Sequence, residues 1–325
     1  MVFNLHEKLE DLLPWQDSQW TYLTGQIDSG KLPHAIILSG PSHTGKEYFA
    51  KYFAFLILCK SPIKKMPCGQ CKSCLLNKSG NHPDLKIIQP EPKSKIINID
   101  VIRNLEDFFS QTAQQQGWKI VVISSAESMN INASNALLKS LEEPSLKTLI
   151  ILVCSNPVRL PITVKSRCQQ LNFPVPNETE VSLWLNNKLP NYKKINELIE
   201  YANGRPILAM DIADTDYIQA RRDFNKSMDG LAFNNLLPLD IAEIYKKNDP
   251  ELIIDWLYYK LAFEIKSKDN ITSLMLAFRY MDKLIQAKKW IQSTSNPNLQ
   301  LIWEELFMNW KYLFITRKSN DSLLK

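Results

Sequence analysis

A segment near the N-terminus contains residue types that bind phosphate groups. It reads Gly40-Pro41-Ser42-His43-Thr44-Gly45-Lys46-Glu47 and lies between an apolar run and a helical pattern, as a P-loop does. Gly40 and Gly45 would let backbone N–H groups turn toward a phosphate, and Lys46 would reach the terminal phosphates of a nucleotide. The next position, where a P-loop enzyme places a Ser or Thr to ligate Mg²⁺, holds Glu47.

The second half of a nucleotide-hydrolysing site is also altered. P-loop ATPases place an acidic residue at the end of a neighbouring strand to hold Mg²⁺, but here the apolar run ends in Ser124-Ser125. Neutral hydroxyl groups lack the negative charge with which a carboxylate holds Mg²⁺, and they do not take a proton from water at neutral pH. Repulsion between Glu47 and a phosphate about 4 Å away amounts to about 4 kcal/mol at an effective dielectric constant of about 20. We therefore expect a structural P-loop with weak or no binding of ATP or ADP.

Four cysteines crowd into one short segment: Cys59, Cys68, Cys71 and Cys74. Tetrahedral Zn²⁺ takes four thiolates, and Cys-x-x-Cys turns present two sulfurs to one point, so the spacing predicts a closed structural zinc site. His82 could replace one ligand, although His82-Pro83-Asp84 fits the start of the next strand better. Buried or redox-active cysteines are the alternative. With four protein ligands the metal would brace a protrusion and catalyse nothing.

Arg167, in Ser166-Arg167-Cys168, precedes the last predicted strand of the first domain. A guanidinium there could project from the sheet edge toward the phosphates of a neighbouring molecule, as an arginine finger does. A surface ion pair is the ordinary role of such a residue.

Apolar runs alternate with helical patterns through residues 1–173, which predicts a parallel five-stranded sheet covered by helices. Asp100 is expected to cap a helix that starts at Val101, and Pro144 to stop a helix that starts near Ala133. The expected strands are Ala35–Ser39, Leu85–Ile88, Lys119–Ser124, Thr148–Cys154 and Gln169–Phe173.

The rest of the chain reads as helical. Pro174-Val175-Pro176 marks a hinge, after which residues 174–213 predict a small domain of three helices, the first with a capping box at Asn177 and Glu180 and the second ending at Gly204. Residues 214–325 predict an all-α domain, with helices expected over Glu251–Ile265, Ser273–Ile291 and Leu299–Ile315. Its tryptophans Trp256, Trp290, Trp303 and Trp310 fit a core at helical spacing, and interface anchors are the alternative.

Composition excludes several classes of protein. The chain has 325 residues, 45% of them hydrophobic and 22% charged, which excludes wholesale disorder. No apolar run approaches the roughly 20 residues that span a bilayer, and the start lacks the pattern of a secretory signal, so we expect a cytoplasmic protein that does not bind membranes. The net charge of +5 is compatible with nucleic acid nearby but does not identify a dedicated binding domain.

Three motifs together carry a family resemblance: Asn135-Ala136-Leu137-Leu138-Lys139-Ser140-Leu141-Glu142-Glu143-Pro144, then Asn156-Pro157 with Leu160-Pro161, then Ser166-Arg167-Cys168. They resemble the AAA+ clamp-loader subunits of bacterial DNA polymerase III. With the cysteine module at about 59–74 and His82-Pro83-Asp84, the chain is most similar to the delta prime members of that family. The similarity covers about residues 20–212, and the C-terminal third fits only in length and helical character.

The resemblance implies an AAA+ P-loop domain, a helical lid and a C-terminal collar for oligomerisation. It also implies a subunit of the DNA polymerase holoenzyme that lacks ATPase activity of its own and supplies Arg167 in trans to an adjacent ATPase subunit. The lid position of a phosphate-sensing Arg aligns near Ile207, with Arg205 close by. The implied partners are the gamma or tau and delta subunits, the sliding clamp and primer-template DNA. The alternatives are an ATP-hydrolysing gamma- or tau-like motor subunit and a stand-alone zinc-bearing nucleic-acid-binding protein.

Overall fold

The computed structural model describes residues 12–91, 94–115, 117–213, 215–233, 235–267, 273–291 and 297–314. The chain divides into two compact units between Thr215 and Asp216. The first unit holds the sheet and the helices up to the end of the expected lid. The boundary expected between residues 173 and 174 lies inside this unit and stays a prediction.

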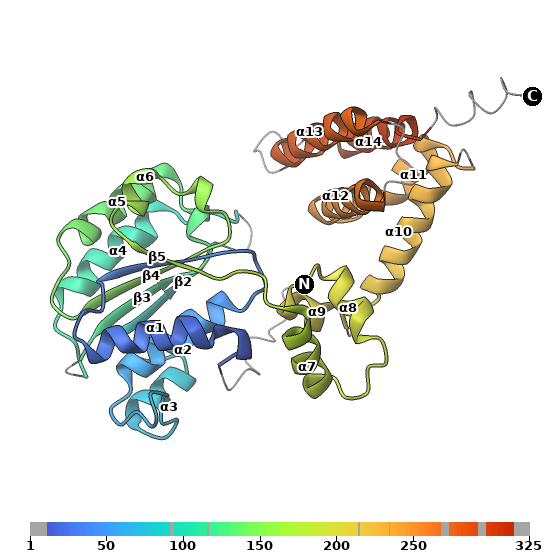
Figure 1. Ribbon diagram of the computed structural model, residues 1–325. Coiled ribbons are helices and arrows are strands. Elements are labelled where there is room, and N and C mark those ends of the chain that lie inside the picture. The colour runs from blue at the N-terminus through green and yellow to red at the C-terminus, as the bar shows by residue number, and fades with distance from the viewer. Residues whose placement is uncertain are drawn as a thin grey trace, which may run out of the picture. The chain divides into compact units, whose positions relative to one another are not determined.

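A parallel sheet forms the centre of the first unit, with the strand order β2-β3-β4-β1-β5 (Figure 1). Ala35 of β1 pairs with Ile150 of β4, and Ile36 pairs with Gln169 of β5. The predicted five-stranded sheet is confirmed, with the third and fifth strands one residue shorter than expected. The strands are β1 (Ala35–Ser39), β2 (Leu85–Ile88), β3 (Lys119–Ile123), β4 (Thr148–Cys154) and β5 (Gln169–Asn172).

Helices cover both faces of this sheet (Figure 1). On one face, α1 (Asp17–Asp28) and α2 (Lys46–Leu58) bury aromatic side chains that include Phe49 and Phe53. On the other face, α4 (Ile99–Ser110) and α5 (Ile131–Glu142) bury aliphatic residues that include Leu137. The short helices α3 (Lys72–Lys78) and α6 (Ile162–Lys165) and the 3₁₀ turns η2 (Pro14–Gln16), η3 (Ala126–Ser128) and η4 (Pro157–Arg159) complete this region.

The starts of two of these helices differ from the sequence prediction. The prediction that Asp100 caps α4 was wrong, because the extended residue before the helix is Asn98, and Asp100 lies in the first turn. A carboxylate there is still favourable, since it lies near the positive end of the helix dipole. Helix α5 starts two residues earlier than expected because the Asn130 side chain caps it, accepting a 2.8 Å hydrogen bond from the Ala133 N–H.

Three helices follow the sheet in the first unit: α7 (Glu178–Lys188), α8 (Ile195–Tyr201) and α9 (Pro206–Ala213). Asn177 caps α7 by accepting a 3.0 Å hydrogen bond from the Thr179 N–H. Helix α8 is followed by Asn203 and Gly204 in left-handed conformations, which agrees with the predicted glycine stop.

The second unit is helical, with α10 (Tyr217–Ala232), α11 (Pro238–Tyr245), α12 (Pro250–Ser267), α13 (Leu274–Ile291) and α14 (Leu299–Tyr312) among its described residues. Trp256, Trp303 and Trp310 are buried in one hydrophobic core, as the core interpretation predicted, whereas Trp290 is 45% exposed. Trp256 Nε1 donates to Tyr217 Oη at 2.8 Å. Ile315, the expected end of α14, lies outside the described residues. Nowhere in the described part of the chain is a helix both long and apolar enough to cross a membrane.

Candidate nucleotide, metal and arginine sites

The P-loop lies between β1 and α2, and both of its glycines are required by close packing. Gly40 has φ 149°, and a Cβ there would lie 2.0 Å from the Phe173 carbonyl oxygen. Gly45 has φ 88°, and a Cβ there would lie 2.3 Å from Leu13 Cδ1. The loop therefore has the predicted backbone, but the N-terminal segment already fills the space beside Gly45.

Lys46 turns back onto its own loop. Its side chain is buried, with 3% of the residue exposed, and its Nζ donates to the Pro41 carbonyl oxygen at 2.5 Å. Burial lowers the pKa of Lys46 to about 8, although the negative charges of Glu127 and Glu47 oppose this shift. In this conformation the Lys46 ammonium is therefore engaged by its own loop.

Glu127 is a charged member of the site that the sequence analysis missed. It lies in η3, just after β3, and its Oε1 accepts a 3.0 Å hydrogen bond from the Ser155 N–H at the end of β4. Its Oε2 is buried and has no hydrogen-bond partner among the described residues. Burial, together with the Glu127 carboxylate, raises the pKa of the Cys154 thiol to about 12. Glu127 thus supplies a negative charge beside Lys46 from within the chain.

The predicted hydroxyl pair lies at the end of β3, where an ATPase has its Mg²⁺-binding acid. Ser124 is buried, and its Oγ has no hydrogen-bond partner within the described ranges. Ser125 adopts a left-handed conformation with φ 51°, and the chain then enters η3. The carboxylate of Glu127 consequently enters the site from the turn that follows the strand.

Two further segments cover the P-loop. Trp15 Nε1 in η2 donates to the Thr44 carbonyl oxygen at 3.0 Å. From the start of α9, the Ile207 N–H donates to the His43 carbonyl oxygen at 3.1 Å, and the Ile207 side chain is buried. Arg205 Nε donates to the Ala202 carbonyl oxygen at 3.0 Å, which directs this group toward the end of α8.

The four predicted metal ligands come together in a module that follows α2 and includes α3 (Figure 1). The Sγ atoms of Cys59, Cys68, Cys71 and Cys74 all lie within 4.8 Å of one another. The Cys59–Cys71 and Cys68–Cys74 Sγ distances are both 3.9 Å. Zn–S bonds of about 2.3 Å in a tetrahedron require sulfurs about 3.8 Å apart, so this arrangement fits a zinc ion.

Hydrogen bonds to these sulfurs also fit thiolate ligands. The N–H groups of Cys68 and Cys71 donate to the sulfurs of Cys59 and Cys68, both at 3.3 Å. Hydrogen bonds from Ser61 and from the backbone lower the pKa of Cys68 to about 6, whereas burial raises the pKa of Cys59 and of Cys74. A dication at the centre would stabilise all four thiolates.

His82 has a different role from the cysteines. Its Nδ1 accepts a 3.1 Å hydrogen bond from the Asp84 N–H, so its Nε2 carries the proton and donates to Ser73 Oγ at 2.7 Å. Ser73 Oγ in turn donates to the Leu58 carbonyl oxygen at 2.7 Å. Both ring nitrogens are therefore occupied, and burial lowers the pKa of His82. His82 ties the cysteine module to the end of α2 and to the start of β2.

Arg167 follows α6, and 36% of its side chain is exposed. Its Nη2 lies 2.7 Å from Glu142 Oε1 at the end of α5. Its Nη1 donates to the Thr163 carbonyl oxygen at 3.0 Å and to Ser166 Oγ at 3.3 Å. The cation is therefore held at the surface, where a neighbouring molecule can reach it.

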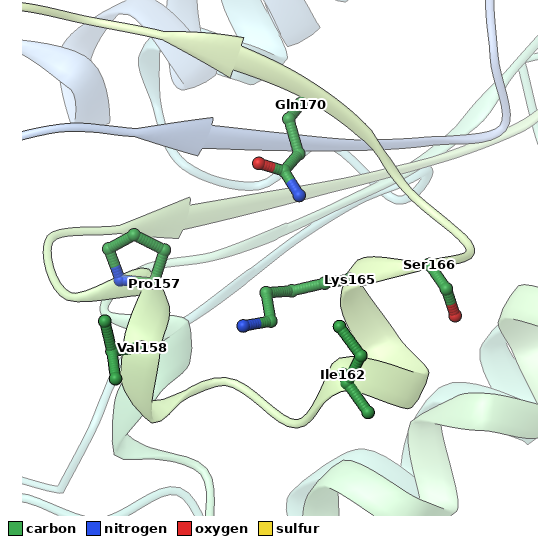
Figure 2. Close-up of a pocket in the computed structure, with 6 residues that line it drawn as sticks. All are labelled: Pro157, Val158, Ile162, Lys165, Ser166 and Gln170. Atoms are coloured by element: carbon green, nitrogen blue, oxygen red, sulfur yellow. The ribbon is translucent and has the colours of Figure 1, made fainter.

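A hollow of about 330 Å³ is lined by Ser166, which precedes Arg167, and by Lys165, which lies between Val158 and Ile162 (Figure 2). Pro157 and Gln170 complete its lining. Val158 is 86% exposed, Ile162 is 72% exposed, and Leu146, in the loop after α5, is 98% exposed. Exposed apolar side chains around a surface cation are typical of a surface that contacts another protein.

A parallel sheet in this strand order, with a P-loop between its inner strand β1 and α2, defines a protein of the AAA+ class. The profile of the family described as "DNA polymerase III, delta subunit" matches residues 15–177. A DNA polymerase III subunit delta' of Pseudomonas aeruginosa is 32% identical over 94% of this chain and 99% of its own length. The chain belongs to the delta prime family of DNA polymerase III subunits.

Two further comparisons agree with this family and fold. A DNA polymerase III subunit delta' of Haemophilus influenzae is 32% identical over 81% of this chain and 80% of its own length. A solved structure of a DNA polymerase III gamma subunit-related protein from Thermotoga maritima has a TM-score of 0.51 and 18% identity. It covers 91% of this chain and 99% of its own, and it supports the fold alone.

Proposed function

We propose that this chain is a clamp-loader subunit that does not hydrolyse ATP and that supplies Arg167 to the nucleotide site of a neighbouring ATPase subunit. The observation that carries this proposal is the contrast between two cations. Lys46 is buried and bonded to its own loop, whereas Arg167 is exposed at the sheet edge. An arginine finger in trans accelerates phosphoryl transfer by roughly 10³ to 10⁵ because its charge stabilises the transition state.

The partners follow from the family resemblance and from the surface. Arg167 would face a gamma or tau subunit. The delta subunit, the sliding clamp and primer-template DNA would belong to the same cytoplasmic assembly, which is a part of the DNA polymerase holoenzyme.

In the second unit, α13 exposes Leu274, Phe278 and Ile285 at helical spacing. This apolar face supports the proposal that residues 214–325 form an oligomerisation collar.

The same proposal assigns zinc to Cys59, Cys68, Cys71 and Cys74 as a structural ion. Four thiolates complete a tetrahedral site and leave no position for a reactive water, so the ion would fix the module without catalysis. Elemental analysis of the purified protein should find about one zinc per chain, and Cys71→Ser should lose most of it. Cys168→Ser, which changes a cysteine outside the module, should keep the zinc. Equal zinc in both variants would refute the assignment.

The function is tested in a reconstituted loader with clamp and primed DNA. Arg167→Ala should lower single-turnover ATP hydrolysis at the neighbouring site by about 10³, while the complex still assembles. Arg159→Ala is the matched control, because Arg159 is an exposed arginine on the nearby turn η4. It should leave hydrolysis within about twofold. Unchanged hydrolysis by Arg167→Ala in an intact complex would falsify the finger assignment.

The isolated chain separates the alternatives. A motor subunit would release phosphate from Mg-ATP by itself, and this chain should not. A stand-alone zinc-bearing nucleic-acid-binding protein would show salt-sensitive DNA binding that Cys71→Ser abolishes. We expect weak DNA binding by the isolated chain that is the same with and without Cys71.

A further inference from the structure

Arg167 is held by three acceptors from two different parts of the first unit. The Thr163 carbonyl oxygen and Ser166 Oγ belong to its own turn, so they move with it. Glu142 Oε1, at 2.7 Å from Nη2, belongs to α5. Of the contacts described for the guanidinium, the one to Glu142 alone fixes its direction relative to another element.

The position of Glu142 is unfavourable for a carboxylate without a nearby cation. It is the last residue of α5, and Glu143 follows at the C-cap. The C-terminal end of a helix carries partial negative charge, where cations are preferred and carboxylates are destabilising. A carboxylate kept at an unfavourable helix end, with a cation placed to compensate it, points to a functional constraint. Here the compensating contact is the Arg167 guanidinium.

The contacts also leave Arg167 able to bind a second anion. An arginine has five N–H donors; Thr163 and Ser166 accept from Nη1, and Nη2 forms the ion pair with Glu142. The Nε donor has no acceptor among the described residues. A side chain ordered in advance loses less conformational entropy when a phosphate arrives.

We infer that Glu142 is the positioning residue that orients Arg167 for a phosphate group of the neighbouring subunit. This inference rests on the proposed function, because it assumes that Arg167 acts in trans. Glu142 would not touch the nucleotide. It would hold the guanidinium in place through the ion pair at Nη2, so that the Nε donor stays available for the phosphate.

Glu142→Gln tests this role in the reconstituted loader with clamp, primed DNA and ATP. It removes the charge and keeps the shape, and it should lower kcat by about three- to tenfold with KM for ATP within about twofold, because a looser finger impairs the transition state and not substrate binding. Glu142→Asp, which keeps the charge, should recover part of kcat. Glu143→Gln makes the same charge change at the same helix end and should match the unaltered chain.

Thermal unfolding of the isolated variants separates positioning from folding, and Glu142→Gln and Glu143→Gln should unfold at similar temperatures. An unchanged or raised kcat in Glu142→Gln would overturn the inference, because it would mean that Glu142 is idle or restrains the finger. An equal loss in Glu143→Gln would overturn it too. Loss in Arg167→Ala without loss in Glu142→Gln rejects this inference alone, whereas full activity in Arg167→Ala rejects the proposed function itself.

Discussion

The P-loop and the Arg167 edge belong to one sheet domain, yet they treat a positive charge in opposite ways. At the P-loop, Lys46 is buried, donates to its own loop and lies within the electrostatic influence of Glu127. At the edge, Arg167 stays at the surface beside exposed apolar side chains. A fold can therefore keep the architecture of a phosphate site while its accessible cation lies elsewhere.

The largest expected difference between these two regions is in the turnover of the assembled loader. Lys46→Met removes the P-loop ammonium and keeps most of the side-chain volume, so single-turnover hydrolysis should stay within about twofold. Arg167→Ala in the same assay should lose about 10³. A comparable loss from Lys46→Met would contradict this expectation, since it would show that the chain's own P-loop takes part in hydrolysis.

The next difference is in the pH dependence of stability. The pKa of Lys46 is lowered from 10.5 to about 8, so between these values the unfolded chain binds a proton that the folded chain does not. The free energy of unfolding contributed by Lys46 should therefore rise by about 1 to 3 kcal/mol between about pH 7 and pH 10. Urea unfolding of the unaltered chain and of Lys46→Met across this range measures it. A constant difference between the two would show that Lys46 is not a buried cation.

The smallest expected effect is on nucleotide affinity. Glu47→Thr restores the residue type that ligates Mg²⁺, but Lys46 stays buried and Ser124 still offers no carboxylate. Binding of Mg-ATP by the isolated chain should strengthen by less than about tenfold, or 1.4 kcal/mol. Isothermal titration calorimetry measures the change. Strengthening by a thousandfold would show that Glu47 alone kept the nucleotide out.

The inner strands β1, β3 and β4 could be predicted from the sequence because buried parallel strands are nearly continuous runs of Ile, Val and Leu. The cysteine cluster could be predicted because its spacing is local. The prediction that Asp100 caps the helix was wrong because Asn98 and Asp100, two residues apart, both favour a helix start, and only the backbone decides between them.

Contacts between distant segments could not be predicted from the sequence. Glu127 was missed because the acid was sought at the end of β3, while the left-handed Ser125 turns the chain so that a residue in the next turn reaches Lys46. The packing of Leu13 on Gly45 and the pair of Glu142 with Arg167 join residues that no short motif connects. Acidic residues at the C-terminal end of α5 were a signal for the Glu142–Arg167 pair, but they were used only for the family resemblance.

Trp15 connects the P-loop with the three helices that follow the sheet. Its Nε1 is bonded to the Thr44 carbonyl oxygen, and its ring meets Trp184 of α7 edge-on at 5.3 Å. Any swing of the three helices after the sheet would have to pull this indole away either from the loop or from its aromatic neighbour. We therefore expect this indole to hold the loop and the three helices together as one latched piece.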